Sequence, residues 1–244
     1  MLISKKDKFA ITFKDDKYTY EQLLRYSQLY ADKFSLECKP GKILICAQNS
    51  PEWCFAFYGA MRCKSIVVPL DAQSTKKEIE YVINDCRPDI VFISDDKKEM
   101  FADMNLHDAR LMTKDDVLLF DDKNIPATDI PLGNLEDVML INYTSGTTGN
   151  PKGVMLTYKN VMFNIDSVSK QVPIFQEESN VMVLLPLHHI LPLLGSLVAP
   201  LYMGGTLHIA EAMNAESIIK TLNAGKVSII IGVPRLYDML VKGI

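Results

Sequence analysis

The sequence has little of what small secreted domains and zinc-binding domains depend on. Its cysteines number five, an odd count, and no two of them are spaced as Cys-x-x-Cys. It has only four histidines and no Cys/His cluster, which argues against a structural zinc site, and we predict no metal ligand. We expect reduced thiols that pack as small hydrophobic groups, as is typical of a cytosolic protein.

An excess of positive charge and an uninterrupted apolar span are also absent. Lys and Arg total 26 against 30 Asp and Glu, which argues against a protein that binds nucleic acid by neutralising its phosphates. The N-terminus lacks the apolar run of a secretory signal. Residues 181–203 contain no Asp, Glu, Lys or Arg, but prolines and histidines interrupt them. This pattern favours a buried strand and helix over a membrane span.

The chain does contain a regular succession of short apolar strands and helices. Its 244 residues, 48% of them hydrophobic and 23% charged, are typical of a globular chain of one or two domains. We expect strands at Phe9–Phe13, Lys17–Thr19, Lys42–Ala47, Ile66–Val68, Ile90–Ile93, Val138–Tyr143, Val154–Leu156, Val181–Leu185, Thr206–Ile209 and Val227–Ile231. We expect helices at 19–34, 50–63, 74–86, 159–170, 189–201 and 215–224, and from Pro234 onward.

This alternation predicts βαβ units, and therefore an α/β fold of mostly parallel sheets flanked by helices. Two helix starts are explicit in the sequence. Thr19 is followed three residues later by Gln22 in the spacing of a capping box, and Ser50-Pro51-Glu52 combines a cap, a proline and an acid. The segment at about 115–137 is rich in Asp, Asn, Pro and Gly, and we interpret it as a connector and a subdomain boundary.

The most informative segment runs from Tyr143 to Gly153 and reads Tyr-Thr-Ser-Gly-Thr-Thr-Gly-Asn-Pro-Lys-Gly. Its glycines allow a sharp turn that brings backbone N–H groups close to a ligand. Its hydroxyl groups can donate to phosphate oxygens, and Lys152 adds a positive charge. The segment therefore indicates a polyphosphate site, and the alternative is a surface hairpin turn of small polar residues.

A P-loop of the Walker A type does not fit this segment. Lys152 lies between Pro151 and Gly153, and no Ser or Thr follows it to hold magnesium. The next residues, Val154–Leu156, are expected to form a strand, whereas a P-loop opens a helix.

The segment resembles the signature loop of the adenylate-forming (AMP-binding) superfamily, which includes acyl-CoA synthetases, luciferases and nonribosomal-peptide adenylation domains. Gly153–Thr157 resembles acyl-CoA synthetases in particular, although Tyr158 stands where that group usually has histidine. Leu185–His189 is similar to the Pro-Leu-aromatic-His segment of the family. Gly232–Tyr237 resembles the Val-Pro-Arg segment of long-chain fatty acyl synthetases.

The resemblance implies that a carboxylate is activated with ATP and Mg²⁺ to an acyl-adenylate and passed to a thiol, here coenzyme A. The carboxylic acid expected is a long-chain fatty acid, and no nucleic acid is expected as a partner. Two alternatives stay open: an adenylation domain that loads a carrier protein, and a non-catalytic nucleotide-binding module. We expect a cytoplasmic protein; a fatty substrate is compatible with peripheral membrane contact, although no basic amphipathic helix indicates it.

The resemblance also implies roles for particular residues. His189 would orient the acyl carboxylate and the α-phosphate as the catalytic histidine; the alternative is a histidine of the core. His188 is interpreted as local structure, and Arg235 as either a surface residue or part of a substrate tunnel. The residues implied to contact the β- and γ-phosphates are Thr144, Ser145, Gly146, Thr147, Thr148, Gly149 and Lys152.

The family normally continues with an adenine-contacting segment that ends in Thr-Glu, an Asp for the ribose, a hinge and a small C-terminal domain with a catalytic lysine. None of these elements is in the sequence. We therefore expect residues 1–244 to be the N-terminal part of the large domain, without the small C-terminal domain, and to be unable to catalyse adenylation alone.

Overall fold

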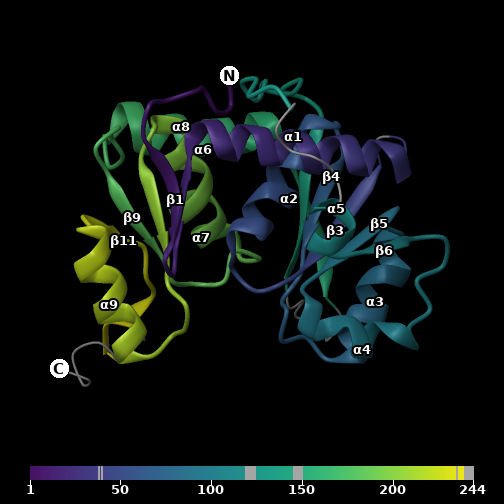
Figure 1. The fold of residues 1–244 in the computed structure, drawn as a ribbon. Helices are drawn as coiled ribbons and strands as arrows, with labels where there is room; N and C mark the ends of the chain where they lie inside the picture. Colours follow the sequence, from purple (N-terminus) through teal and green to yellow (C-terminus); the bar gives the residue numbers. More distant parts are fainter. Residues whose placement is uncertain (38, 40, 119–124, 145–150, 235, 239–244) are drawn as a thin grey trace.

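The computed structural model describes residues 1–244 apart from 38, 40, 119–124, 145–150, 235 and 239–244. The described strands form two sheets, in the orders β11-β9-β10-β1-β2 and β6-β5-β3-β4-β7-β8. Helices flank both sheets (Figure 1). The predicted α/β fold of mostly parallel sheets flanked by helices is confirmed.

The five-stranded sheet joins the start of the chain to its last third. Its strands are β1 (Phe9–Phe13), β2 (Asp16–Thr19), β9 (Asn180–Val183), β10 (Thr206–Ile209) and β11 (Ile229–Ile230). Only the β1–β2 hairpin is antiparallel within it; β1 pairs with β10, and β9 pairs with both β10 and β11, in parallel.

The six-stranded sheet is built from the middle of the chain. Its strands are β3 (Lys42–Cys46), β4 (Ile66–Pro69), β5 (Ile90–Ile93), β6 (Arg110–Met112), β7 (Val138–Thr144) and β8 (Lys152–Thr157). Its pairs are parallel except β7–β8, which is an antiparallel hairpin. The connector expected at 115–137 lies between β6 and β7, and its role as a subdomain boundary stays a prediction.

The longer helices lie where the sequence predicts them, with ends that differ by a few residues. The helical segments are α1 (Tyr20–Glu37), α2 (Pro51–Arg62), α3 (Lys76–Cys86), η1 (Asp95–Lys97), α4 (Lys98–Ala102), α5 (Lys114–Leu118), α6 (Tyr158–Asp166), η3 (Ser167–Gln171), α7 (Ile190–Pro192), η4 (Leu193–Val198), α8 (Ala199–Met203) and α9 (Ala215–Gly225). The η3 and η4 segments are π-helical turns. The expected strand and interrupted helix at 181–203 are confirmed as β9 followed by α7, η4 and α8, and no described helix is long and apolar enough to cross a membrane.

Alternate residues of the central strands face different cores, which is why these strands are apolar throughout. Ile43 and Ile45 of β3 join the core between the sheets, whereas Leu44 packs on the other face, under α3. In the same way, Val181 of β9 faces the core between the sheets and Met182 faces α9. Figure 1 shows the resulting layers, with α9 on the outer side of one sheet and α3 and α4 on the outer side of the other.

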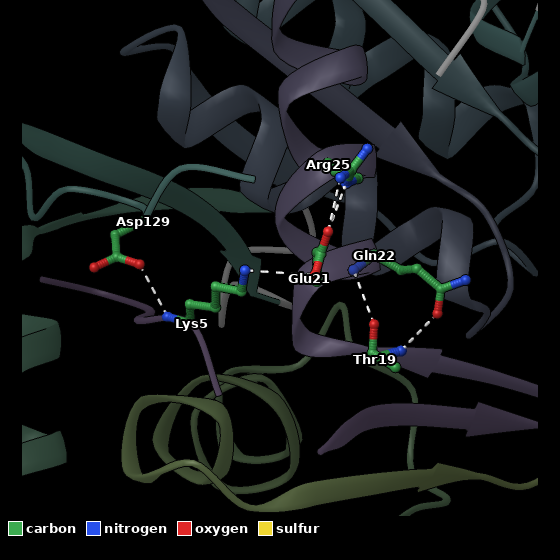
Figure 2. Close-up of polar contacts among 6 residues, drawn as sticks. All are labelled: Lys5, Thr19, Glu21, Gln22, Arg25 and Asp129. Atoms are coloured by element: carbon green, nitrogen blue, oxygen red, sulfur yellow. Dashed lines mark hydrogen bonds and ion pairs between the residues drawn. The ribbon is translucent and has the colours of Figure 1, made fainter. Parts of the chain in front are cut away.

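Helix α1 extends over both halves of the molecule (Figure 1), and its start is capped as the sequence predicts. The Thr19 hydroxyl accepts from the Gln22 N–H at 3.2 Å, and the Gln22 side chain accepts from the Thr19 N–H at 2.8 Å. In Figure 2, Glu21 lies between Lys5 and Arg25, with N–O distances of 3.4 and 2.7 Å. The capping box and the acidic first turn fix where α1 begins.

Helices α1 and α2 pack closely because Gly59 lacks a side chain. A Cβ atom at Gly59 would lie 2.6 Å from Cβ of Tyr30, which is too close for a non-bonded contact. The predicted start of α2 is confirmed, since the Ser50 hydroxyl accepts from the Trp53 N–H at 3.2 Å and proline follows the cap. At the other end of α2, Arg62 donates to Ser27 Oγ at 2.9 Å and to the backbone carbonyl of Thr128.

Cysteine pairing plays no part in the fold of the described residues. Cys46, Cys54, Cys63 and Cys86 are all free thiols there. Burial raises the pKa of Cys46 to about 12, which keeps this thiol protonated and unreactive at neutral pH.

Replacing Arg62 should destabilise the protein more than replacing an exposed arginine. Arg62→Ala removes the donor to the buried Ser27 hydroxyl and one donor to the partly buried Leu24 carbonyl, so we expect the free energy of unfolding to fall by about 2–3 kcal/mol. Arg110→Ala is the control, because the Arg110 side chain is exposed and lies 3.7 Å from Glu37 in an ion pair. Urea denaturation measures both, and equal losses in the two variants would contradict the importance of Arg62.

Candidate functional site

The β7–β8 hairpin holds the two ends of the glycine-rich loop next to each other. Thr144 at the end of β7 is the strand partner of Lys152 at the start of β8. Both side chains are exposed, and Lys152 forms no ion pair with any residue that the structure describes. The other predicted phosphate contacts lie outside the described residues, namely Ser145, Gly146, Thr147, Thr148 and Gly149.

Tyr143 fastens this hairpin to helix α3. Its ring lies over Gly153, the residue opposite it on β8, where an added Cβ would be 3.2 Å from Cζ of the tyrosine. Its hydroxyl donates to Oδ2 of Asp85 at 2.5 Å. Burial, and then this hydrogen bond, raise the pKa of Tyr143 well above its ordinary value. The base of the loop is therefore braced on its α3 side by a neutral tyrosine.

His188 and His189 follow the end of β9 and lie side by side, with ring centroids 4.0 Å apart. His189 is exposed, which argues against its interpretation as a core histidine; its catalytic role stays a prediction. His188 is mostly buried, with Nε2 3.8 Å from Oδ2 of Asp71. Burial lowers the pKa of His188 to about 4; the His189 ring acts in the same direction and Asp71 in the opposite one. At neutral pH the contact between His188 and Asp71 is thus not an ion pair.

Three further polar residues border the histidines, and the sequence analysis gave them no role. Asn49 donates to the Leu185 carbonyl at 2.9 Å, and Asn142 donates to the His188 carbonyl at 2.7 Å. Asp71 follows β4. A signal for Asn142 is present in the sequence, since it is a polar residue inside an apolar strand. Asn49 and Asp71 each follow a buried strand, at the sheet edge where open α/β sheets bind ligands.

An apolar groove of about 400 Å³ includes Ile190, the residue after His189, in its lining. One wall comes from the segment that follows His189, through Ile190 and Leu194, and another comes from Leu156 of β8 and Val161 of α6. Asn160 and Asn164 are polar, and the other lining residues are apolar or glycine: Leu156, Val161, Ile165, Val168, Ile174, Phe175, Ile190, Leu191, Leu194, Gly195, Ala199 and Ile231. The groove can therefore hold an apolar group whose polar end lies near His189.

Comparison with known proteins shows which family the chain belongs to. A family model described as AMP-binding enzyme matches residues 4–243. The chain belongs to the AMP-binding enzyme family. The resemblance of the Tyr143–Gly153 segment to the adenylate-forming superfamily is thereby confirmed.

The relatives that this chain matches have names that describe different acids and acceptors. Bacitracin synthase 2 of Bacillus licheniformis is 26% identical over 97% of the chain, and a feruloyl-CoA synthase of Amycolatopsis is 25% identical over 83%. A human long-chain-fatty-acid–CoA ligase is 25% identical over 79% of the chain. The chain spans 9%, 40% and 32% of the lengths of these three relatives.

Solved structures show the same fold. The ATP-bound crystal structure of MatB from Rhodopseudomonas palustris superposes with a TM-score of 0.85 at 24% identity, over 99% of this chain and 50% of MatB. The N-terminal domain of FACL13 from Mycobacterium tuberculosis gives a TM-score of 0.84 at 21% identity, over 96% of this chain and 61% of that one. At this identity the likeness is one of fold.

The stability of the AMP-binding enzyme should fall in mild acid. Burial lowers the pKa of His188 and of His208 to about 4, against an ordinary value of 6.5. The unfolded chain therefore binds more protons than the folded one between about pH 6.5 and 4, and stability falls as the pH decreases through this range.

Urea denaturation at several pH values measures this slope. His188→Gln and His208→Gln should each reduce it, and His107→Gln, which removes an exposed imidazole, is the control. A slope that stays the same in the first two variants would show that neither buried ring is responsible.

Proposed function

We propose that the chain is the N-terminal part of an ATP-dependent acid–thiol ligase. The enzyme activates a long-chain fatty acid as its acyl-adenylate and transfers the acyl group to coenzyme A. The observation that carries this proposal is the apolar groove, which begins at Ile190, next to His189, and is bordered by the strand that follows the glycine-rich loop. A pocket of this size and lining is typical of a small-molecule site.

The chemical problem in this reaction is charge repulsion, because a carboxylate must attack the α-phosphorus of an anionic nucleotide. Lys152 supplies an exposed cation at the base of the loop, and Thr144 supplies a hydroxyl donor opposite it. In this proposal they bind the β- and γ-phosphates together with Ser145, Gly146, Thr147, Thr148 and Gly149. Hydrogen-bond donors and cations directed at a developing negative charge stabilise it.

His189 has an orienting role in this proposal. The attacking carboxylate is already ionised at neutral pH, so the step needs no general base. The exposed imidazole comes directly before Ile190, which lines the apolar groove, and in this proposal it holds the carboxylate in line with the α-phosphate. Mg²⁺ belongs to the implied reaction, but the described residues bring no three His, Cys, Asp or Glu side chains together, so no step is derived through the metal.

A carrier protein is the alternative acceptor, and the match to bacitracin synthase 2 favours it as the second candidate. A substrate panel that offers free coenzyme A or a carrier protein to the longer protein containing this chain distinguishes the two. A non-catalytic nucleotide-binding module is the third candidate, and it would bind ATP without forming acyl-adenylate in that protein. Peripheral membrane contact and cytoplasmic location stay predictions.

Removing the cation at the base of the loop should weaken nucleotide binding. We expect Lys152→Ala to reduce ATP affinity at least tenfold in calorimetry, because a phosphate loses its charged donor. Lys159→Ala is the matched control, since Lys159 is also exposed but pairs with Glu136 at 3.2 Å. Unchanged ATP affinity in Lys152→Ala would refute the proposed phosphate site.

The 244-residue chain alone should not catalyse adenylation, so its pyrophosphate exchange should stay at background.

Narrowing the groove should exclude long acyl chains. Gly195 faces Ile231 across the groove, where an added Cβ would already be 3.3 Å from the Ile231 side chain. We expect Gly195→Leu to weaken binding of cis-parinaric acid at least tenfold, as measured by its fluorescence, and to weaken competition by octanoate less. Ala102→Leu on exposed α4 is the control. Equal binding by wild type and Gly195→Leu would show that the groove does not hold the acyl chain.

A further inference from the structure

Asn49 replaces a missing strand partner for the segment that leads to the histidines. Strand β9 ends at Val183, so the chain beyond it leaves the five-stranded sheet. The Asn49 side chain donates from Nδ2 to the Leu185 carbonyl at 2.9 Å and accepts at Oδ1 from the Leu187 N–H, also at 2.9 Å. A neighbouring strand would satisfy the same carbonyl and N–H with its own backbone. A carboxamide suits this purpose because it offers a donor and an acceptor side by side in one plane.

Asn142 holds the next part of the same segment from a different strand. Its Nδ2 donates to the His188 carbonyl at 2.7 Å, and its side chain is buried in the middle of β7. Side chains alternate along a strand, so Asn142 and Thr144 lie on one face of β7 and Tyr143 lies on the other. The contact with Asn142 therefore places the His188 backbone on the face of β7 that carries Thr144, and Asn142 and Thr144 themselves are one strand repeat apart, roughly 7 Å.

Asn142 lies in the six-stranded sheet and Asn49 follows strand β3 of that sheet, whereas the segment they hold continues from the five-stranded sheet. The amides thus tie the end of β9 to the ends of β3 and β7. The segment is also held by packing, since Leu187 is buried in the core between the sheets, but packing alone does not fix its backbone hydrogen-bonding groups. The His189 N–H bonds within the segment, to the Pro186 carbonyl at 3.2 Å. The two amides are the side chains that hold the backbone of Leu185–His188 by hydrogen bonds among the described contacts.

We propose that Asn49 and Asn142 are positioning residues that fix His189 relative to the base of the glycine-rich loop. They act through the backbone of Leu185–His188, and neither needs to touch the substrate. The part played by His189 rests on the proposed function, but the clamp formed by the two amides does not. Loss of these hydrogen bonds would leave backbone groups of Leu185–His188 unpaired and let this segment move away from β7.

The imidazole of His188 reports on this clamp directly. It shares a cavity of about 520 Å³ with Asn49, Asp71 and Glu211, and His189 packs against it. Asp71, Glu211 and His189 are therefore the titratable groups that face it. If the segment moves outward, the ring gains water, its charged form becomes less costly and its pKa rises toward the ordinary value.

The test is an NMR pH titration of the histidine side chains in Asn49→Leu and Asn142→Leu. Leucine keeps a similar bulk, excludes water and adds no charge, so only the hydrogen bonds are lost. We expect the proton affinity of His188 to rise at least tenfold in each variant, with weaker contacts between the His188 and His189 rings. Asn49→Ser and Asn142→Ser are the second pair, should a leucine variant fail to fold.

Asn214→Ala is the matched control, because it removes a side-chain hydrogen bond of 2.8 Å to the Ser217 N–H at the start of α9. It should lower the melting temperature without changing the His188 titration. The proposal is wrong if the folded variants at positions 49 and 142 keep the wild-type His188 titration and ring contacts.

Addition of ATP separates this proposal from the proposed function. In the wild type, ATP should shift the His189 resonances; in the Asn142 variants the shift should disappear while ATP still binds. A longer protein containing this chain that binds no ATP would refute the proposed function, and the titrations without nucleotide would still decide whether the amides hold the segment.

Discussion

The layer of helices shared by the two sheets is the constraint on which the site depends. Residues of both sheets pack into one core, and Val181 of β9 and Val67 of β4 belong to the same cluster of buried side chains as residues of α1 and α2. Gly59 allows α1 and α2 to approach closely in this layer. Because the helices fix the separation of the sheets, the ends of β7 and β9 meet at one junction. The loop base and the two histidines are therefore neighbours, although more than 30 residues separate them in the chain.

The charges at this junction suit an anionic ligand. Lys152 supplies a positive charge at the loop base, and Tyr143 is kept neutral beside Asp85. His188 is also neutral at physiological pH, because burial disfavours its charged form and a second imidazole lies against it. A neutral ring contributes hydrogen-bonding groups without attracting a carboxylate into the core. The cation and the hydrogen-bonding groups are thus divided between the hairpin and the histidine segment.

The sequence predicts those features that depend on local patterns. The capping box of Thr19 and Gln22, and the strand at Thr206–Ile209, follow from spacing and from apolar runs. Strand β6 and helices α4 and α5 were missed, because three to five residues are too few to show a period. The antiparallel pairing of β8 was also missed, since the pattern of a short strand does not tell its direction. The partners of Asn142 and Asn49 lie 46 and 136 residues away, so only the tertiary structure reveals them.

The order of the helices and strands along the chain explains why the polar loop and histidines are connected to the walls of an apolar groove. Strand β8 and helix α6 follow the loop and form one wall of the groove, and α7 and η4 follow the histidines and form another. Both π-helical turns reach the groove, η3 through Val168 and η4 through Leu194 and Gly195. A π-turn inserts an extra residue into a helix and is frequent at functional sites. Changes in these turns would alter the groove without moving the described base of the loop or the histidines, so in the proposed function the accepted acid could change while the phosphate site stays the same.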